Sequence, residues 1–413
     1  MKVLMVPKPI LSSDMSILGY CFRYNQADEL ITNQPSRIFE GAMSTPCLDV
    51  LELVGLDALT GGQEIFVPLN KMSLFVSVEH RCSVPSEKII FLLDEDVDPA
   101  EPFLSKIKEK KNLGYRFAIE GITNYDKMVP ILKLCDFVFI DCRTANYKQT
   151  LQNLNNRHPH LIRLAANVHT MSMFDNIKRS SYHGFEGKFY STPSKRVRQS
   201  IAPIKVNRIQ LMNAVRDDDF EIEEIVKIVS QDPSLSISLL RFVNSPYLNL
   251  SQQVKTISHA VAMLGQKEVR KWVITATSGL LGDDKPDETT KLSLMRAKFA
   301  ESLSPQFEMA IHAPSLFLMG LFSILDVVLD VPMDEALKVV KVTDQIHEAL
   351  VSSKGEYAKV FNLIKAYESA DWNEVSRLMV LHKLDAQNIY DSYIDTVKWY
   401  GAIISPAEEE SAE

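Results

Sequence analysis

The sequence predicts an α/β barrel domain followed by an all-helical domain, and three observations support this fold class. The first half of the chain alternates short β-branched and aromatic runs with helix-compatible segments, which is typical of parallel strands joined by helical crossovers. The second half carries apolar residues at a helical period. The chain has 413 residues. That is longer than one hydrophobic core usually serves, so two domains are expected.

Eight candidate strands precede residue 191, which suggests a TIM-like barrel, although a doubly wound sheet also fits the spacing. The first two candidates are joined by a short connection that contains Pro7, Pro9 and Ser12. Such a connection cannot hold a helical crossover, so these strands should pair antiparallel and the barrel should contain one antiparallel strand. The candidates are residues 3–6, 17–24, 64–69, 88–93, 116–119, 137–142, 161–165 and 184–190.

A polar and basic stretch after residue 190 is the best candidate for a linker, because it lacks apolar periodicity. We therefore expect a barrel domain over residues 1–192 and a linker over residues 193–204. The all-helical domain, with a C-terminal helical extension, should cover residues 205–402. The acidic residues 403–413 should form a disordered tail.

One helix boundary in the second half has a clear physical basis. Asp232 can cap a helix with its carboxylate, Pro233 suits the first turn, and an apolar stripe begins at Leu235. This helix should end near Asn244. A later helix should end at Gly265, a residue that adopts the left-handed conformation of helix C-termini without strain.

The composition excludes several classes of function. With a net charge of -8, the chain lacks the concentrated basic surface that nucleic acid binding needs. The N-terminus has no signal-peptide pattern, so we expect a cytoplasmic protein. Residues 316–331 are apolar but too short for a bilayer span, so we expect a buried core helix and no membrane insertion. The five cysteines lack zinc-site spacing and should be free thiols.

Three stretches of the second half resemble the HDOD family, a helical output module related in fold to HD phosphohydrolases but without their metal site. They are residues 232–246, 260–265 and 270–272. Residues 296–301, 317–323 and 366–372 are similar to the extension that follows HDOD when an EAL domain precedes it. The signature residues are Asp232, Pro233, Leu240, Asn244, Ser245, Pro246, Gly265 and Trp272.

Four stretches of the first half resemble the strands of EAL domains, namely residues 19–23, 114–121, 135–141 and 184–190. The resemblance implies that active members hold two metal ions through carboxylates and an amide, which activate water against the phosphodiester of cyclic di-GMP. In this chain it places Cys21, Pro68 and Leu92 where those members carry metal ligands. None of these three side chains can hold magnesium.

The remaining pocket positions of the EAL resemblance are also altered. Glu120 keeps its acidic type, but Gly121 replaces its acidic neighbour and Phe139 stands at the lysine position. Arg23 is shifted from the position of the phosphate-contacting arginine. Asp141 keeps its type, His169 replaces a late glutamate, and Glu186 replaces a glutamine. The resemblance thus implies a degenerate EAL domain without catalytic residues.

An alternative is that the substitutions build a different site. Cys21, His169, Glu120 and Asp141 would all face one end of the barrel, where a Cys/His pair could bind a transition metal or act as a nucleophile. A pocket filled by neutral or apolar side chains needs fewer assumptions, so we expect neither metal nor cofactor. The four histidines after the linker are scattered and, without a His-Asp dipeptide, do not suggest an HD metal site.

These observations lead to three functional hypotheses. The first is a non-catalytic signal-transduction scaffold that presents a degenerate EAL barrel and an HDOD module to protein partners. The second is a sensor that binds cyclic di-GMP without hydrolysis, with Asp141 and Arg23 as its support. The third is a residual cyclic di-GMP phosphodiesterase. The sequence leaves self-association open and does not identify the partners.

Overall fold

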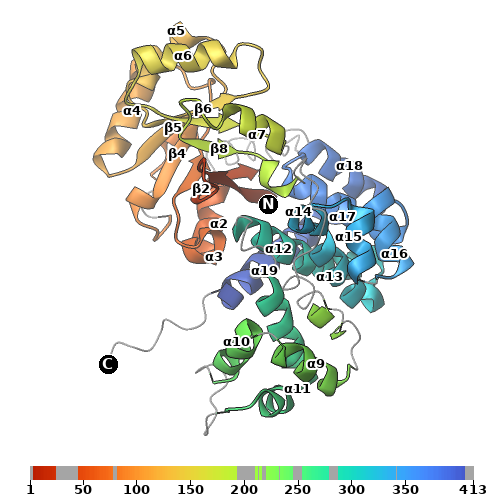
Figure 1. Cartoon of the computed structure of the whole chain (residues 1–413). Coiled ribbons are helices and arrows are strands. Elements are labelled where there is room, and N and C mark those ends of the chain that lie inside the picture. Colours follow the sequence, from red (N-terminus) through yellow and green to blue (C-terminus); the bar gives the residue numbers. More distant parts are fainter. Residues whose placement is uncertain are drawn as a thin grey trace. The chain divides into compact units, whose positions relative to one another are not determined.

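A computed structural model describes residues 3–24, 45–77, 81–192, 210–212, 214–215, 220–231, 233–244, 254–278, 287–340 and 342–404. The chain forms two compact units (Figure 1). The first unit combines Met1–Thr192 with Lys365–Val397, and the second combines Pro193–Ile364 with Lys398–Glu413. The predicted linker, residues 193–204, lies outside the described residues.

Eight strands of the first unit close into a barrel in sequence order. The sequence prediction of eight strands in a TIM-like barrel is therefore confirmed, and the doubly wound alternative is wrong. The strands are β1 (Met5–Leu11), β2 (Ile17–Tyr24), β3 (Ile65–Pro68), β4 (Ile89–Leu93), β5 (Arg116–Ile119), β6 (Phe137–Asp141), β7 (Ile162–Ala166) and β8 (Gly184–Glu186).

Strand β1 runs antiparallel to both of its neighbours, as the short first connection predicted. Met5 lies opposite Tyr24 and Lys8 opposite Cys21 in β2, and Ile10 lies opposite Glu186 in β8. The other neighbouring strands pair parallel. The N-terminal end of β1 therefore lies at the same barrel end as the C-terminal ends of β2 to β8.

Six predicted strands have different bounds in the structure, four of them by one residue at one or both ends, and β1 and β8 differ most. Strand β1 begins at Met5 rather than residue 3 and extends to Leu11, because its pairing with β2 continues along the whole hairpin. Strand β8 ends at Glu186 and does not reach residue 190. The chain turns at Gly187, where an added Cβ would lie 2.0 Å from the carbonyl oxygen of Val168. Only glycine allows this close approach of two backbones.

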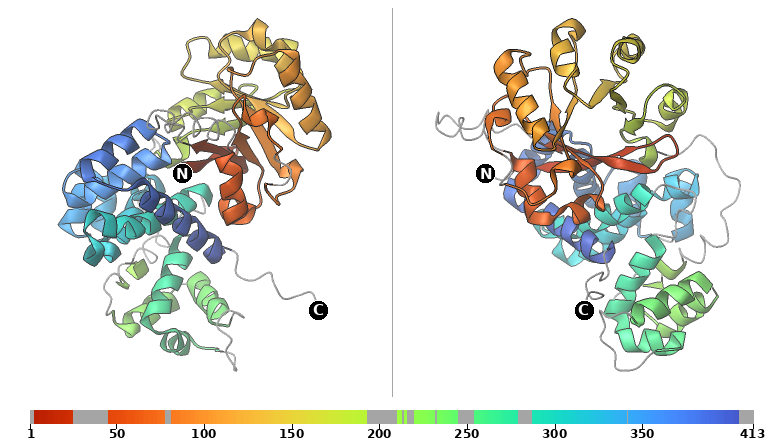
Figure 2. Two further views of the ribbon diagram at one scale, coloured as in Figure 1. Left: turned by 180° about the vertical axis from the view of Figure 1, so that it is seen from behind. Right: turned by 90° about the vertical axis from the view of Figure 1, so that its left-hand side faces the viewer.

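Helices follow most of the parallel strands and surround the barrel, as the right-hand view of Figure 2 shows. Two of them have polar caps. The side chain of Asn124 accepts a hydrogen bond from Lys127 N, and that of Thr170 from Met173 N. The helices are α2 (Pro46–Val54), α3 (Leu56–Thr60), α4 (Glu101–Asn112), α5 (Tyr125–Leu132), α6 (Tyr147–Arg157) and α7 (Met171–Ile177).

Apolar side chains of the strands fill the barrel interior. The ring of Phe66 packs edge-on against Phe137 at 5.1 Å and against Phe139 at 5.3 Å between ring centroids. These contacts add to the gain from burying large aromatic surfaces. The cluster consists of Ile10, Cys21, Phe66, Ile90, Leu92, Ala118, Phe137, Phe139, Leu164 and Ala166.

The C-terminal helices correct the predicted domain ranges. They are α17 (Glu356–Glu368), α18 (Trp372–His382) and α19 (Ala386–Ile404). Residues 205–402 were expected to form one helical domain, but Lys365–Val397 belong to the same compact unit as the barrel. Tyr367 accounts for this, because its hydroxyl hydrogen bonds with the backbone of Met5. Helix α19 also extends to Ile404, into the predicted tail, and residues 405–413 lie outside the described residues.

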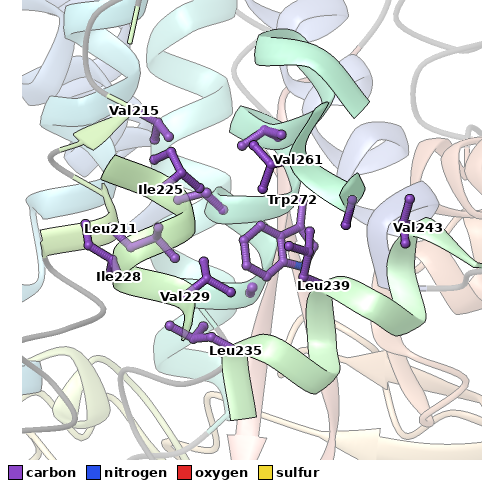
Figure 3. Packing of buried hydrophobic residues seen from close by; sticks show 14 of the residues in the cluster. Leu211, Val215, Ile225, Ile228, Val229, Leu235, Leu239, Val243, Val261 and Trp272 are labelled. Carbon is purple, nitrogen blue, oxygen red and sulfur yellow. The ribbon is translucent and has the colours of Figure 1, made fainter. Parts of the chain in front are cut away.

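The described part of the second unit is helical, as predicted. Its first core is formed by α9, α10 and α11 and includes Leu235, Leu239 and Trp272 (Figure 3). The helices are α9 (Ile222–Ser230), α10 (Pro233–Val243), α11 (Ile257–Ser278), α12 (Asp287–Leu303), α13 (Ala313–Phe322), α14 (Leu325–Leu329), α15 (Met333–Val340) and α16 (Asp344–His347).

A second core of this unit centres on α12, α13 and α14. At Gly320 an added Cβ would lie 2.4 Å from the carbonyl oxygen of Arg296, so glycine lets α13 cross α12 closely. Within the described residues, Ala310–Leu329 has the length and mean hydropathy (1.8) of a membrane-spanning segment. The expected single core helix is instead two helices, α13 and α14, and both bury side chains in this core.

Gly265 lies inside α11 and interrupts its helical backbone, with φ 67° and ψ 169°. The expected positive φ is present. Its ψ differs from the value of about 47° of the left-handed conformation. Gly265 nevertheless separates two helical segments, as the sequence predicted.

Candidate functional site

The candidate site is the barrel mouth, which we define as the end where β2 to β8 finish and β1 begins. Arg23 lies near the end of β2, Glu120 directly follows β5, and Glu186 ends β8. Because the carboxyl ends of parallel strands meet at one edge, their last inward side chains converge here. Lys8 joins them from β1 because that strand runs in the opposite direction.

A guanidinium group joins two carboxylates across the barrel mouth. Nη1 of Arg23 donates to both carboxylate oxygens of Glu120, each at 2.7 Å. Its Nη2 lies 3.5 Å from Oε2 of Glu186, and Nζ of Lys8 lies 4.0 Å from Oε1 of the same carboxylate. The side chain of Glu186 is only 3% exposed. A buried carboxylate needs such cationic partners to offset the loss of hydration.

The electrostatic surroundings hold Arg23 in its charged form. Burial favours the neutral form, but the carboxylates of Glu186 and Glu120, and at high pH the thiolate of Cys21, outweigh it, so the pKa of Arg23 lies well above its usual value. Burial lowers the pKa of Lys8, an effect that the nearby Glu186 partly offsets. The guanidinium also lies over the Phe139 ring, with Cζ 5.8 Å from the ring centroid, a favourable cation–π arrangement.

The layer beneath this network is apolar. Leu92 and Phe139 are buried in the barrel core, and Pro68 ends β3 at a partly buried position. Cys21 lies in the same core, 0% exposed. Burial raises the pKa of its thiol to about 12, so at neutral pH the sulfur is a protonated thiol and neither a nucleophile nor a metal ligand.

The structure does not bring together the Cys21/His169 pair of the alternative hypothesis. Cys21 lies among apolar side chains, whereas His169 is an exposed residue after β7. Partial desolvation of its ring by the surrounding residues, followed by the charge of Arg143, lowers the pKa of His169. Among the residues that the structure describes, no group of three or more His, Cys, Asp or Glu side chains could hold a metal ion.

Asp141 lies at the end of β6, where it pairs with a neighbour in sequence. Its carboxylate accepts hydrogen bonds from Nε and Nη2 of Arg143 at 3.1 and 2.7 Å. Partial burial raises the pKa of Asp141, but the bonds from Arg143 outweigh it and the pKa is lowered. Gly121 is exposed and has φ +71°, so it contributes a turn of the backbone and no chemical group.

Sequence reasoning missed Lys8 and Lys188 at the barrel mouth. Lys8 was missed because the first strand was predicted to end at residue 6, whereas β1 continues to Leu11 and places Lys8 two residues before the inward Ile10. Lys188 follows the end of β8 by two residues. Its Nζ donates to the hydroxyl of Ser369, more than a hundred residues away, and no local pattern indicates that contact.

In the helical unit, the signature residues have structural roles. The side-chain amide of Asn244 donates to the carbonyls of Leu240 and Val254 at 2.7 and 2.8 Å, and its oxygen accepts from Val254 N at 2.8 Å. This side chain thus connects the last turn of α10 with Val254, which precedes α11. Trp272 is 2% exposed and Leu240 packs against the same core. Pro233 begins α10 as predicted, whereas Asp232, Ser245 and Pro246 lie outside the described residues.

Comparison with known proteins agrees with this division of the chain. The profile of the HDOD domain matches residues 201–348. The uncharacterized protein YuxH of Bacillus subtilis is 25% identical over 412 residues, which is 97% of this chain and 98% of that protein. The cyclic di-GMP phosphodiesterase CdgJ of Vibrio cholerae is 25% identical over 320 residues, 77% of this chain and 74% of its own length.

Two solved EAL structures were also matched. The Bacillus subtilis YkuI protein, in complex with cyclic di-GMP and calcium, has 15% identity and a TM-score of 0.37, covering 48% of this chain and 57% of its own. The FimX EAL domain from Pseudomonas aeruginosa, bound to cyclic di-GMP, has 16% identity and a TM-score of 0.37. The match covers 47% of this chain and 92% of the FimX chain. The chain therefore combines a barrel that has one antiparallel strand with a region that matches the HDOD domain, and this two-domain organisation agrees with the EAL-HDOD resemblance of the sequence.

Proposed function

We propose that this chain is a non-catalytic scaffold in cyclic di-GMP signalling, which acts in the cytoplasm through protein contacts of its barrel and its HDOD domain. The observation that carries the proposal is the guanidinium of Arg23, which bridges Glu120 and Glu186 at the barrel mouth. The likeness to CdgJ, named as a cyclic di-GMP phosphodiesterase, supports the signalling class.

The side chains at the barrel mouth do not fit a pair of divalent metal ions. Magnesium prefers hard oxygen ligands in octahedral geometry, whereas Cys21, Leu92 and Phe139 offer a buried thiol and two hydrocarbon groups. Both oxygens of Glu120 are already engaged by Arg23. A metal ion that binds here would have to displace the guanidinium of Arg23, which already neutralises the charge of these carboxylates.

The decisive experiment is hydrolysis of cyclic di-GMP by the purified full-length chain with magnesium or manganese. CdgJ, assayed in parallel, serves as the positive control. We expect no turnover above the protein-free background. Metal-dependent hydrolysis that Glu120→Ala abolishes would overturn the proposal, because it would show that the carboxylate binds a catalytic metal rather than the guanidinium.

A second candidate function, a sensor that binds cyclic di-GMP without cleaving it, is favoured by the cations around the mouth. Lys8 and Arg23 contact Glu186, and Arg143 and Lys188 are close enough to lower the pKa of His169 after the larger effect of burial. Phosphate groups are bound by such clusters. Calorimetric titration of the full-length chain tests this candidate, and no heat at high micromolar cyclic di-GMP would count against it.

A further inference from the structure

The tight turn between α17 and α18, residues 367–371, packs within the barrel unit and is called here the Ser369 turn. Its backbone is fixed by hydrogen bonds from Ala370 N to the carbonyl of Tyr367 at 2.8 Å and from Asp371 N to that of Ala366 at 3.0 Å. Ala370 has φ 55°, a left-handed conformation that is unfavourable for alanine. The side chain of Asp371 then caps α18 by accepting from Glu374 N. The turn is thus held in one conformation.

The Ser369 turn engages both lysines of the barrel mouth. Nζ of Lys8 donates to the carbonyl oxygen of Ser369 at 2.8 Å, and Nζ of Lys188 donates to its hydroxyl. Lys8 belongs to β1 and Lys188 follows β8, so the two ammonium groups come from adjacent strands of the barrel. One serine therefore supplies oxygen acceptors to two cations.

A buried tyrosine anchors the turn to β1. The hydroxyl of Tyr367 accepts from Met5 N at 3.3 Å and donates to Met5 O at 3.0 Å. Its ring is 1% exposed and packs against Tyr393 and Trp372, with ring centroids 4.8 and 5.4 Å apart. The anchor places Ser369 at the start of β1, beside the barrel mouth.

Lys8 connects the Ser369 turn with the ion pairs across the barrel mouth. Lys8 lies 4.0 Å from Glu186, which pairs with Arg23. Ser369 is thus the outermost member of a polar chain that passes through Lys8 and Glu186 to Arg23. A displacement of the Ser369 backbone would remove an acceptor from Lys8 and leave Glu186 as its neighbouring anion.

We propose that the Ser369 turn is an intramolecular competitor for the cationic rim of the barrel mouth, so that a phosphate-bearing ligand must displace it from Lys8 and Lys188. The carbonyl and hydroxyl oxygens of Ser369 occupy the positions that phosphate oxygens would take on these ammonium groups. This inference goes beyond the scaffold function, because it concerns what opens the mouth and requires no hydrolysis. By linkage, a ligand that displaces the turn is itself held more weakly while the turn is in place.

The test compares the full-length chain with the double variant Tyr367→Phe and Ser369→Ala. These changes keep the ring and remove two hydroxyls of the turn. Titration calorimetry with cyclic di-GMP, and separately with inorganic pyrophosphate, measures affinity. We expect one or both probes to bind the variant about tenfold more tightly, the factor that corresponds to the loss of a charge-assisted hydrogen bond. The pair Tyr147→Phe and Ser105→Ala, on α6 and α4, is the matched control and should leave affinity unchanged.

A second measurement needs no substitution. Hydrogen exchange of the backbone amides in residues 366–371 of the unmodified chain should become faster when saturating cyclic di-GMP or pyrophosphate is added. Equal affinity of the variant and the unmodified chain for both probes would overturn the inference, as would the absence of binding to either protein. Hydrolysis of cyclic di-GMP by the variant would contradict the scaffold function and leave the competition intact, so the two failures are distinguishable.

Discussion

The barrel mouth and the helical unit each contain one polar side chain with several bonding partners. The two side chains differ in how far away in the sequence those partners lie. Asn244 is neutral and bonds to backbone groups of Leu240 and Val254, close to it in sequence. Arg23 is charged and bridges Glu120 and Glu186, which belong to distant strands. The contacts of Asn244 therefore join residues that are near one another in the sequence, whereas the network at the barrel mouth forms only when the barrel closes.

The largest effect should come from the helical core itself. Trp272→Ala removes a ring that is 2% exposed, and such a change usually lowers the free energy of unfolding by about 3–5 kcal/mol. Urea unfolding followed by circular dichroism measures this loss. Met263→Ala is the control on the same helix, since Met263 is 48% exposed and should cost less than about 0.5 kcal/mol. Equal costs for the two variants would contradict the assigned packing.

Arg23→Met should be next in size, because it removes the nearest cationic partner of the buried Glu186 and leaves Lys8 at 4.0 Å. Removing one partner of a buried ion pair costs about 3–5 kcal/mol, and partial exposure of Arg23 reduces the expected loss of stability to about 2–3 kcal/mol. Arg157→Met breaks an exposed pair with Asp126 and serves as the control. If both variants unfolded at the same urea concentration, the ion pairs of Arg23 would contribute no more to stability than an exposed pair.

Asn244→Ala should destabilise the helical unit by about 2 kcal/mol, because the amide of Val254 loses its acceptor. Hydrogen exchange at Val254 should accelerate in this variant more than exchange within the barrel strands. Exchange that accelerates equally in both units would show that the hydrogen bonds of Asn244 do not act locally.

The smallest effect concerns the pH dependence of the mouth. The bonds from Arg143 hold the pKa of Asp141 below its unfolded value, so the pair stabilises the fold above the unfolded pKa of about 3.9. That contribution is lost as the pH falls through the lower pKa of the folded state. Asp141→Asn should remove this dependence, with a difference below about 1 kcal/mol because Arg143 is largely exposed. Acid titrations of stability for the two proteins provide the comparison.

Much of the barrel could be predicted because its strands carry local signals. The ranges of β2 and β5 agree with the sequence prediction, and the reversed β1 followed from a short connection. The end of β8 could not be predicted, because it depends on how closely Gly187 approaches Val168 in the closed barrel. The return of residues 365–397 to the barrel was missed for a similar reason. An apolar helix face does not reveal which core will bury it.

The sequence predicted which residues lie at the candidate site but not which of them form ion pairs with one another. Sequence reasoning named Arg23, Glu120 and Glu186, and the structure brings these three together. It also grouped Cys21 with His169, which the structure separates into core and surface. Strand alternation shows which side chains face inward, whereas their depth along the barrel depends on register between strands. Ion pairs across the barrel follow only when that register is known.

The discontinuous make-up of the barrel unit has a consequence for its biosynthesis. Residues 193–364 must be synthesised after Thr192 before Tyr367 can reach Met5, which takes roughly 10–35 s at ordinary translation rates. During this interval the nascent barrel leaves the ribosome with the start of β1 uncovered. The HDOD core can form within that time, so the last step of folding in the first unit waits for the second to emerge.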